Sequence, residues 1–374
     1  MKQKKTSGKS DRKKYLGKKL LSIDIGQHTT KIVYGRTTKA GVEVRRAIAI
    51  QTPKGSVENG RIGNVELLVE KISSLIKEEK LKAEYGFCTV ETNKVVAREI
   101  VLPTADKEAM NNMLQFEVQH NMPIDLSNFS VQSRIIGTTE ENGTKKTHFL
   151  CTAVPESLAA GYFDLLQKLG IKAAVMDIQS NSVEKLFEQE FRSGGESVIP
   201  ADKSVAVIDF GYSKINVILL KNGKYRFNRL IDDGAAGIDV NLSAQFNYSE
   251  EEIEDKKAND VDLGKSTALF SDNYPSENEN TLWREANTVK SVIDNWITEI
   301  ERIFSYYNNK NREKVEKVLI YGGTVSMKGF APYLSEALGL PVELIKELGR
   351  VNVSAGTAAD LTPFINSIGA MIRR

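Results

Sequence analysis

Two aspartates at the ends of apolar runs are the residues best suited to chemistry. Asp24 is followed two positions later by Gly26, and Asp209 is followed in the same way by Gly211. A turn at such a glycine directs backbone N–H groups into a cleft, where they can hold phosphate oxygens, and the glycine lets the backbone approach a ligand closely. Because a carboxylate does not attract phosphate directly, we expect Asp24 and Asp209 to hold Mg²⁺ through water, with the metal bridging to the phosphates.

A third glycine turn and further polar residues complete this candidate site. Gly322, Gly323 and Thr324 follow the short apolar run at 318–321. Three such turns can surround a nucleotide from both sides. The other candidate residues lie beside the first two turns and are Gln27, His28, Thr29, Lys31, Tyr212 and Ser213.

Several polar side chains near the turns have alternative explanations. Lys31 could meet a phosphate as a point charge or lie in solvent. Thr29 could offer a hydroxyl, although β-branched residues are common in strands without such a reason. His28 could approach the phosphates or face solvent in its turn. Gln179 and Asp177 could orient a water molecule or cap a helix start. No residue identifies a catalytic base, so the catalytic residues are unknown.

Matching strand patterns position the two Asp-x-Gly turns. Residues 20–33 read as strand, turn and strand, and residues 41–50 continue an antiparallel meander. Residues 204–220 and 224–231 repeat this design around an Asn-Gly hairpin turn at 222–223. Ile-Asp-Ile-Gly at 23–26 is echoed by Ile-Asp-Phe-Gly at 208–211. Two homologous halves that face each other would give such a long-range repeat.

The remaining segments predict a two-lobed α/β protein. Helical spacing of apolar residues predicts helices at 64–80, 107–120, 156–169, 178–192, 237–245, 249–258, 281–308 and 330–338, with one more at the end of the chain. Strands are predicted at 87–90, 95–102, 128–136, 147–154, 318–321 and 342–344, and a loop at 260–279. We therefore expect a first-lobe core at 20–85 and 177–195, an α/β insert at 86–176 and a second lobe at 196–374, with the boundary in the Gly-rich segment at 193–200.

Composition excludes several classes of protein. The 374 residues are 41% hydrophobic and 27% charged, which is typical of soluble globular proteins, and no apolar run is long enough to span a membrane. Cys88 and Cys151 are too few for a disulfide scaffold and lack zinc-site spacing, and the three histidines are far apart in sequence. These features favour the cytoplasm.

Positive charge is concentrated at the N-terminus. Residues 1–20 hold nine Lys or Arg residues against Asp11 alone, a net charge of +8, and because the whole chain nets +2, residues 21–374 net −6. We expect residues 1–19 to be a disordered basic arm, which either has no partner or is attracted to anionic lipid or nucleic acid. Because the remaining residues are acidic overall, they lack the positive charge that attracts nucleic acid, and no nucleic-acid partner is expected for them.

The order of these motifs resembles that of the actin-like ATPase superfamily, which includes actin, sugar kinases and heat-shock chaperone ATPases. Residues 23–31 and 207–213 are similar to its two phosphate loops, and residues 319–324 with Gly329 to its adenosine loop. Residues 178–187 and 354–368 stand where its two connecting helices belong. The resemblance implies an α/β, two-lobed actin-like ATPase fold with duplicated βββαβαβα cores and a small α/β insert in the first lobe. It also implies a nucleotide-capping subdomain at about 232–285 and a last helix that packs back on the first lobe.

The insert narrows the resemblance to the branch that contains FtsA and PilM, and PilM-like proteins are the most similar. The shared features run from Leu20 to the end and include the stretch with Pro53, Gly55 and Gly60, the segment at 116–119 before Met122 and Pro123, and Ala-Val-Pro-Glu at 153–156. The resemblance implies a cytoplasmic adaptor of the type IV pilus assembly platform that binds ATP and Mg²⁺ at the inner face of the membrane. Its partner would be the N-terminal tail of a PilN-like membrane protein, with other platform components or the pilus ATPase as further partners and self-association left open.

The resemblance also implies roles for particular residues. Glu254 and Lys257 would lie against the adenosine, although a solvated acidic helix face explains them as well. A groove beside the insert would take the partner's tail, with Phe116, Gln119, Met122 and Pro123 as the candidate contacts, although Phe116 and Met122 could instead fill the core of the insert.

Departures from the family pattern limit the expected activity. Gln27 stands where Ser or Thr is usual, and residues 233–237 replace a common Gly-Gly pair, so we expect at most weak ATPase activity. One alternative is a small-molecule kinase, for which a catalytic base is missing. Another is an FtsA-like membrane tether of a division filament, which typically adds an amphipathic helix after the core, and the sequence ends within the final expected helix.

Overall fold

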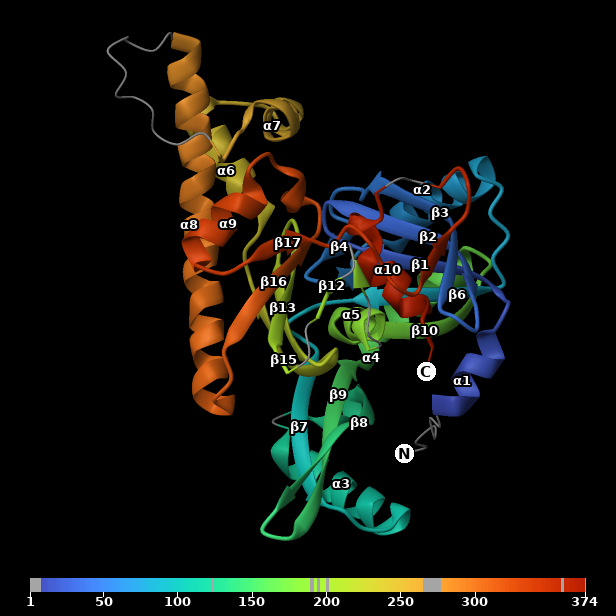
Figure 1. The fold of residues 1–374 in the computed structure, drawn as a ribbon. Helices are drawn as coiled ribbons and strands as arrows, with labels where there is room; N and C mark the ends of the chain where they lie inside the picture. Colours follow the sequence, from blue (N-terminus) through green and yellow to red (C-terminus); the bar gives the residue numbers. More distant parts are fainter. Residues whose placement is uncertain are drawn as a thin grey trace.

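The computed structural model describes residues 8–373 except 123, 189–191, 194–195, 200–201, 265–276 and 358–359. Two α/β lobes lie side by side, and a smaller strand-and-helix insert projects from the first lobe (Figure 1). Both lobes follow the order βββαβαβα along the chain, and the corresponding strands occupy the same places in each sheet. The repeated Asp-x-Gly motif therefore belongs to a repeated structural unit.

The first lobe is built on a six-stranded sheet with the order β10-β6-β1-β2-β3-β18. Its strands are β1 (Lys19–Ile25), β2 (Thr29–Thr37), β3 (Val42–Gln51), β6 (Tyr85–Val90), β10 (Lys172–Ile178) and β18 (Val351–Val353). The first three form the expected antiparallel meander, and β6 runs parallel to β1. Helices α2 (Val65–Glu78) and α4 (Glu156–Lys168) cover one face of the sheet. A small hairpin of β4 (Val57–Glu58) and β5 (Arg61–Ile62) lies beside α4.

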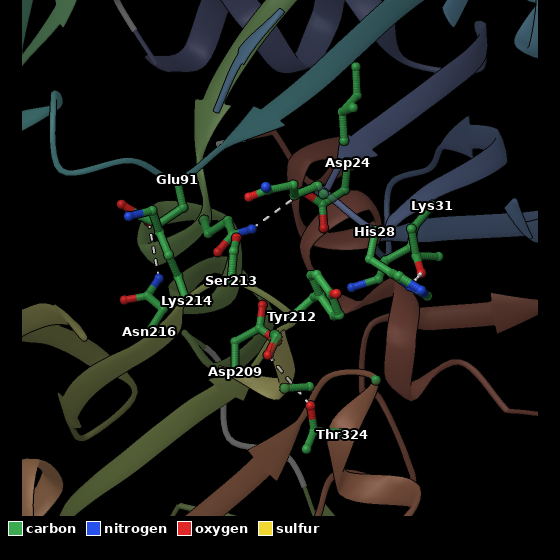
Figure 2. A pocket seen from close by; sticks show the side chains of 18 of the residues that line it. Asp24, His28, Lys31, Glu91, Asp209, Tyr212, Ser213, Lys214, Asn216 and Thr324 are labelled. Atoms are coloured by element: carbon green, nitrogen blue, oxygen red, sulfur yellow. Dashed lines mark hydrogen bonds between the residues drawn. The ribbon is translucent and has the colours of Figure 1, made fainter. Parts of the chain in front are cut away.

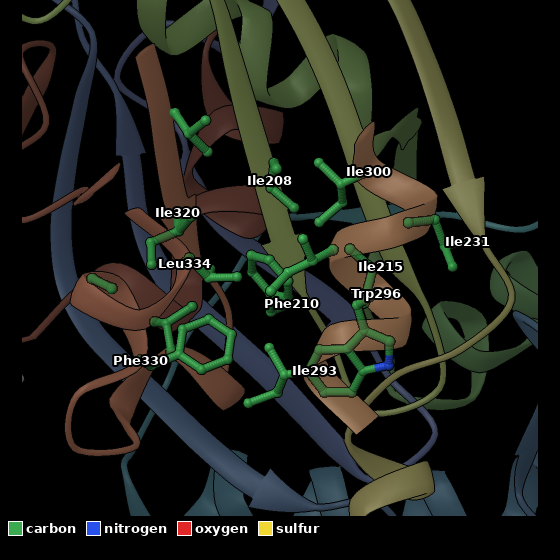
Figure 3. Packing of buried hydrophobic residues seen from close by; sticks show 14 of the residues in the cluster. Ile208, Phe210, Ile215, Ile231, Ile293, Trp296, Ile300, Ile320, Phe330 and Leu334 are labelled. Atoms are coloured by element: carbon green, nitrogen blue, oxygen red, sulfur yellow. The ribbon is translucent and has the colours of Figure 1, made fainter. Parts of the chain in front are cut away.

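The second lobe is built on a five-stranded sheet with the order β15-β14-β13-β16-β17. Its strands are β13 (Ser204–Phe210), β14 (Ile215–Lys221), β15 (Lys224–Ile231), β16 (Val315–Tyr321) and β17 (Val342–Leu344). Every residue of β13 is buried, as its nearly continuous apolar sequence requires of a strand covered on both faces. Helices α6 (Ala235–Phe246), α8 (Glu277–Asn311) and α9 (Phe330–Leu338) cover one face. Figure 3 shows Trp296 of α8 and Phe330 of α9 on either side of Phe210.

Two short helices pack against each other between the lobes. These are α5 (Gln179–Phe187) and α10 (Ile365–Met371), which follow the last core strand of each unit. A Cβ atom at Gly369 would lie 2.2 Å from the carbonyl oxygen of Ser182, so only glycine permits this close crossing. The residues of α10 are buried, and α10 contacts β1 and β6 of the first lobe.

The insert is smaller than expected from the sequence. It consists of β7 (Val96–Pro103), α3 (Lys107–Asn121), a 3₁₀ turn (Leu126–Asn128), β8 (Phe129–Glu141) and β9 (Thr144–Pro155), with the sheet order β7-β9-β8. The expected boundaries at 86–176 are wrong because β6, α4 and β10 complete the first-lobe sheet and its cover. The insert has its own apolar core, in which Leu114 and Val118 of α3 pack on Ile100 and Phe149 of the sheet.

Three further segments refine the expectations. Residues 8–15 form helix α1 (Gly8–Tyr15), so a wholly disordered arm at 1–19 is wrong. β18 joins the first-lobe sheet, so the second lobe does not extend unbroken to residue 374. The Gly-rich boundary segment holds two paired strands, β11 (Arg192–Ser193) and β12 (Glu196–Ser197).

The region expected to cap a nucleotide contains short helices. It includes α6, α7 (Glu250–Asp255) and a π-helix (Lys256–Asp260). Most of the loop expected at 260–279 lies outside the described residues. Of the helices in the described part of the chain, none has the length and apolar character needed to cross a membrane.

Candidate functional site

A cavity of about 340 Å³ lies between the lobes at the ends of β1 and β13. All the sequence-derived candidates for nucleotide binding except Gly322 and Asp177 line it, and both lobes contribute. The candidates on its wall are Asp24, Gly26, Gln27, His28, Thr29, Lys31, Asp209, Gly211, Tyr212, Ser213, Glu254, Lys257, Gly323 and Thr324. Figure 2 shows the side chains of both lobes converging on this space.

The two Asp-x-Gly turns have the same backbone geometry. The N–H of Gly26 donates to the carbonyl of Thr29 at 3.1 Å, and the N–H of Gly211 donates to the carbonyl of Lys214 at 3.1 Å. A Cβ atom would lie 2.8 Å from the acceptor oxygen in the first turn and 2.7 Å from it in the second. Each glycine is therefore required by its turn as well as suited to ligand approach. The tips of the turns, at Gln27, His28 and Tyr212, border the cavity.

Asp24 is held by side chains from three elements. Its Oδ1 accepts hydrogen bonds from Thr89 Oγ1 at 2.9 Å and Gln179 Nε2 at 3.3 Å. Its Oδ2 accepts from Asn366 Nδ2 at 3.2 Å. The carboxylate is thus fixed on the cavity wall by β6, α5 and α10.

Asp209 is fixed on one oxygen only. Its Oδ2 accepts from Asn366 Nδ2 at 2.9 Å, whereas its buried Oδ1 has no hydrogen-bond partner among the described residues. Burial raises the pKa of Asp209 from 3.8 to about 6, and the positive charge of Lys31 opposes this rise. A cation would relieve the cost of the unpaired oxygen.

The donor set fits Mg²⁺ that is held partly by water and phosphate. Hard carboxylate oxygens suit Mg²⁺, which usually keeps several waters and uses only one or two protein carboxylates. Within the described residues, no group of three or more His, Cys, Asp or Glu side chains could hold a metal on its own. Asp24 and Asp209 would therefore hold the ion together with its waters and a ligand's phosphates.

Asn366 joins the two aspartates, and the sequence analysis missed it. Its Nδ2 donates to both carboxylates, and its Oδ1 accepts from the hydroxyl of Tyr321 at 2.8 Å. This side chain is fully buried. No local motif marks it, because only the tertiary fold brings residue 366 to the two strand ends.

The sequence did not predict Glu91, Lys214 and Asn216 at the cavity, and one residue suggested by the sequence, Asp177, lies away from it. Glu91 follows β6, and its Oε2 accepts from Asn216 Nδ2 of the second lobe at 3.1 Å. Burial raises the pKa of Glu91 to about 8, so it is largely protonated at neutral pH. Gln179 reaches the cavity, whereas Asp177 is buried against Lys185 at 2.6 Å. Lys214 and Asn216 complete the second-lobe wall.

The third glycine turn supports the site from behind. Gly322 has a φ of +108°, and a Cβ atom there would lie 2.5 Å from Asp209 Oδ1. Gly322 therefore leaves room for that oxygen without lining the cavity, while Gly323 and Thr324 do line it. In the departure at 233–237, Gly234 lies against the second turn, and the N–H of Ala236 donates to the carbonyl of Tyr212 at 2.8 Å.

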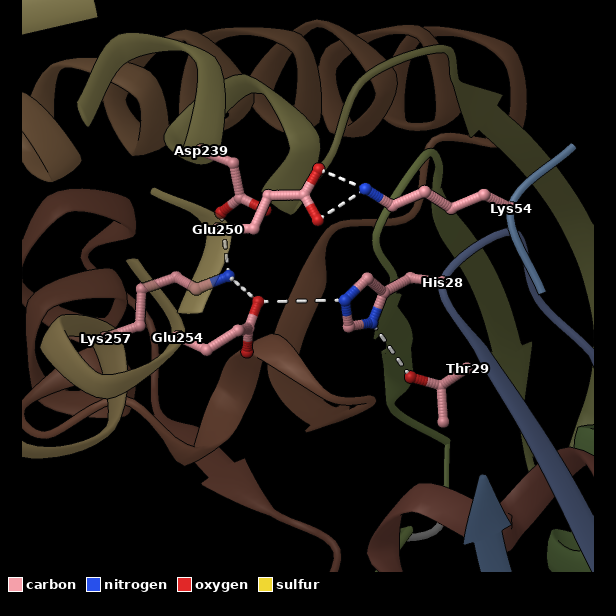
Figure 4. A network of polar contacts seen from close by, with 7 residues as sticks. All are labelled: His28, Thr29, Lys54, Asp239, Glu250, Glu254 and Lys257. Carbon is pink, nitrogen blue, oxygen red and sulfur yellow. Dashed lines mark hydrogen bonds and ion pairs between the residues drawn. The ribbon is translucent and has the colours of Figure 1, made fainter. Parts of the chain in front are cut away.

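Two polar contacts cross the cleft between the first lobe and α7 (Figure 4). Lys54 Nζ lies 2.5 Å from Glu250 Oε1, and His28 Nε2 lies 3.7 Å from Glu254 Oε1. Lys257 holds Glu254 at 2.6 Å and Asp239 at 2.7 Å. The His28 ring also stacks on Tyr212, with ring centroids 4.6 Å apart. We name the Lys54–Glu250 and His28–Glu254 contacts the cleft bridge.

The candidate partner residues divide between the core and the surface of the insert. Met122 is 3% exposed and belongs to the insert core, whereas Phe116 is 58% exposed on α3 and its ring lies tilted against that of His120. Gln119 is also exposed, and Pro123 lies outside the described residues. Burial therefore removes Met122 from the candidate contact surface.

Comparisons with known proteins identify a matching family for the sequence and solved structures of similar fold. A family model described as type IV pilus assembly protein PilM matches residues 22–367. No curated protein matches the sequence. A solved structure of a PilM-PilN type IV pilus biogenesis complex contains a similar chain, with a TM-score of 0.75 and 18% identity, over 94% of this chain and 97% of that one. The ethanolamine utilization protein EutJ from Carboxydothermus hydrogenoformans is similar with a TM-score of 0.55 and 12% identity, over 96% of this chain and 89% of that one. Together with the duplicated strand order, these similarities confirm the expected actin-like ATPase fold.

Proposed function

Because this chain belongs to the PilM family of type IV pilus assembly proteins, we propose that it is a nucleotide-controlled adaptor of the pilus assembly platform. It binds ATP with Mg²⁺ between its lobes and binds the N-terminal tail of a PilN-like membrane protein through its insert. It acts in the cytoplasm, at the inner face of the membrane. Hydrolysis is at most slow, because Gln27 stands in the first turn and no residue is identified as a catalytic base.

The observation that supports the nucleotide site best is the Asp209 oxygen beside two glycine turns, which no described residue bonds. A buried carboxylate oxygen without a partner is costly in an empty pocket and useful when a cation binds. The turns supply backbone geometry suited to phosphate, and Asp24 stands on the other side of Asn366. Asp24 and Asp209 would hold the ion, which would neutralise phosphate charge.

The substitution Asp209→Asn tests this site. It keeps the shape of the side chain and the acceptor for Asn366 but removes the charge that Mg²⁺ requires. We expect the affinity for ATP in the presence of Mg²⁺, measured by calorimetry, to fall at least about tenfold, as loss of a charged metal contact predicts. Asp164→Asn on the exposed surface of α4 is the matched control and should leave the affinity unchanged. Equal ATP affinity in the wild type and Asp209→Asn would overturn the assignment.

The insert is the proposed docking surface for the partner. The chain of similar fold was solved in a PilM-PilN complex, and the family resemblance points to a short membrane-protein tail. On α3, Phe116 offers an exposed aromatic ring and Gln119 offers an exposed amide, which suit an apolar anchor and a backbone contact.

Replacing both Phe116 and Gln119 by alanine tests the docking surface. We expect the affinity for a labelled PilN-like tail peptide to drop by about tenfold or more, since exposed aromatic anchors commonly dominate such interfaces. Phe163→Ala is the control, because Phe163 is 57% exposed on α4, close to the 58% of Phe116. Undiminished peptide binding in the Phe116/Gln119 variant would show that the partner binds another surface. ATP binding by the same variant tests whether it is correctly folded.

A further inference from the structure

Helix α1 is fixed to the first lobe. Tyr15 is 2% exposed, and its ring meets Tyr85 and Phe87 edge-on, with ring centroids 5.3 Å and 5.1 Å apart. The N–H of Gly17 then donates to the carbonyl of Thr37 at 2.9 Å, next to the bridge between Leu16 and Thr37. The guanidinium of Arg12 donates to the carbonyl of Lys39. These contacts hold the end of the basic N-terminal segment in one place.

The docked helix presents a concentration of positive charge. Arg12, Lys13 and Lys14 form its last turn, and the side chains of Lys13 and Lys14 are exposed. The ammonium of Lys14 lies 4.9 Å from the centre of the Tyr15 ring, and that of Lys172 lies 5.6 Å from the centre of the Tyr85 ring. Glu84, a neighbouring carboxylate, is neutralised by Lys18 at 3.0 Å. We name Arg12, Lys13, Lys14 and Lys172 the basic face.

The chemistry of the basic face fits a diffuse anionic surface. Eight of the nine cations in residues 1–20 are lysines, which act as hydrated point charges, whereas recognition of single phosphates favours the arginine fork. The aromatic ring within α1, that of Tyr15, is buried, so it offers no platform on which bases could stack. Leu16, next to the helix, is only 37% exposed, so in the described part of this segment insertion into the acyl region is minor compared with charge attraction.

We propose that the basic face is a docking surface for the anionic lipid headgroups of a membrane. This proposal rests on the proposed function in one respect, since the partner of the adaptor would be anchored in that membrane. In Figure 1, α1 and the insert helix α3 both extend from the same side of the two-lobed body, away from α7. Residues 21–374 carry a net charge of −6, which repels an anionic membrane. A membrane that contacts only the basic face avoids this repulsion.

Vesicle sedimentation of the full chain without any partner tests the proposal. The probes are vesicles of phosphatidylcholine alone and vesicles that also contain phosphatidylglycerol. We expect binding only to the anionic vesicles, and we expect it to weaken as salt is raised because exposed charges are screened. In Lys13→Glu/Lys14→Glu, the binding constant should fall by about tenfold or more, since each basic residue near an anionic surface contributes to the attraction.

A matched charge-reversal control separates the basic face from net charge. Lys71→Glu/Lys77→Glu changes the net charge equally on exposed positions of α2 and should retain vesicle binding within about twofold, because charges beyond a Debye length from the bilayer are screened. Thermal unfolding of both variants reports whether each is folded. Absent binding to anionic vesicles, an equal loss in both variants, or tighter binding to a duplex oligonucleotide than to the vesicles would overturn the proposal. Because the vesicles contain no protein, failure of the adaptor function would leave this result unaffected.

Discussion

At the scale of single residues, the two aspartates differ although their sequence motifs match. Asp24 is bonded through both oxygens, whereas Asp209 has one buried oxygen without a partner in the described part of the chain and has its pKa raised to about 6 by burial. Asn366 separates the two carboxylates by donating to each. Before a cation binds, one carboxylate is therefore hydrogen-bonded through both oxygens, and the other carries an unfavourable buried charge that a cation would relieve.

The pH dependence of stability should reveal the cost of the buried Asp209 charge. Because the folded-state pKa of Asp209 lies above its ordinary 3.8, its contribution to stability is fully present below about pH 4 and is lost as pH rises through about 6. In Asp209→Asn this loss disappears. Without Mg²⁺, the variant should gain about 2 to 3 kcal/mol relative to the wild type between pH 4 and pH 7, since one pKa unit equals 1.36 kcal/mol. Urea denaturation at both pH values measures it, and a parallel pH dependence in the two proteins would contradict the assignment.

At the scale of elements, the cleft bridge ties α7 of the second lobe to the first lobe. The Lys54–Glu250 pair is exposed, with both side chains about three-quarters accessible, so solvent screens it and it adds little to stability. We expect it to act instead on the rate at which the cleft opens, because the pair exists only while α7 lies against the first lobe.

Charge reversal across the cleft bridge should alter nucleotide release. We expect Lys54→Glu to raise the dissociation rate of a fluorescent ATP analogue by about two- to fivefold at low salt, because two like charges then face each other across the cleft. Adding Glu250→Lys should restore the slow rate. The same swap at Lys18 and Glu84, which pair within the first lobe, is the control. If the double variant releases nucleotide as fast as the product of the single effects predicts, the bridge does not act on the cleft.

Local sequence patterns predicted the helices and strands well. They predicted less well whether each belongs to a lobe or to the insert. The meanders, the two Asp-x-Gly turns and the helices of both lobes follow from periodicity and glycine placement, and the turn residues do line one cavity. The insert was assigned too many residues, because β6 and β10 have the same sequence character as insert strands and only sheet pairing separates them. Asn366 and Glu91 could not be found, since their roles depend on contacts distant in sequence. α1 was missed because the contacts that hold it, those of Tyr15, Gly17 and Arg12, are with residues distant in sequence.

At the scale of the whole molecule, the first lobe, the second lobe and the insert meet at Glu184 of α5. Arg134 of the insert forms an ion pair with it at 2.5 Å, and the N–H of Tyr225 in β15 donates to it at 3.0 Å. The side chain of Glu184 is almost fully buried. α5 begins at Gln179, which contacts Asp24, so one helix connects this junction to the cavity.

Removing one partner from this junction should cost more than removing both. Arg134→Met removes the cation that lies 2.5 Å from the buried Glu184, and we expect a loss of about 3 kcal/mol in the free energy of unfolding. The double variant Arg134→Met/Glu184→Met buries no charge there and should recover most of that loss. Chemical denaturation measures both, with Lys203→Met of the exposed Lys203–Glu316 pair as a control expected to cost below about 1 kcal/mol. Equal destabilisation by the single and double variants would show that the pair is not the cause.

The chain returns to complete the first lobe only near its end, and this affects the order in which the lobes can fold. Asn366 and Asp24 are 342 positions apart, and the edge strand β18 and the buried helix α10 come from residues 351–371. While a ribosome is still translating residue 350, the first lobe lacks both, although the second-lobe sheet from Ser204 to Leu344 has already been made. Nascent chains usually fold from the N-terminus onward. Here the lobe that is translated first should be the last to become native, and until then its unfinished surface is open to chaperones and to premature association.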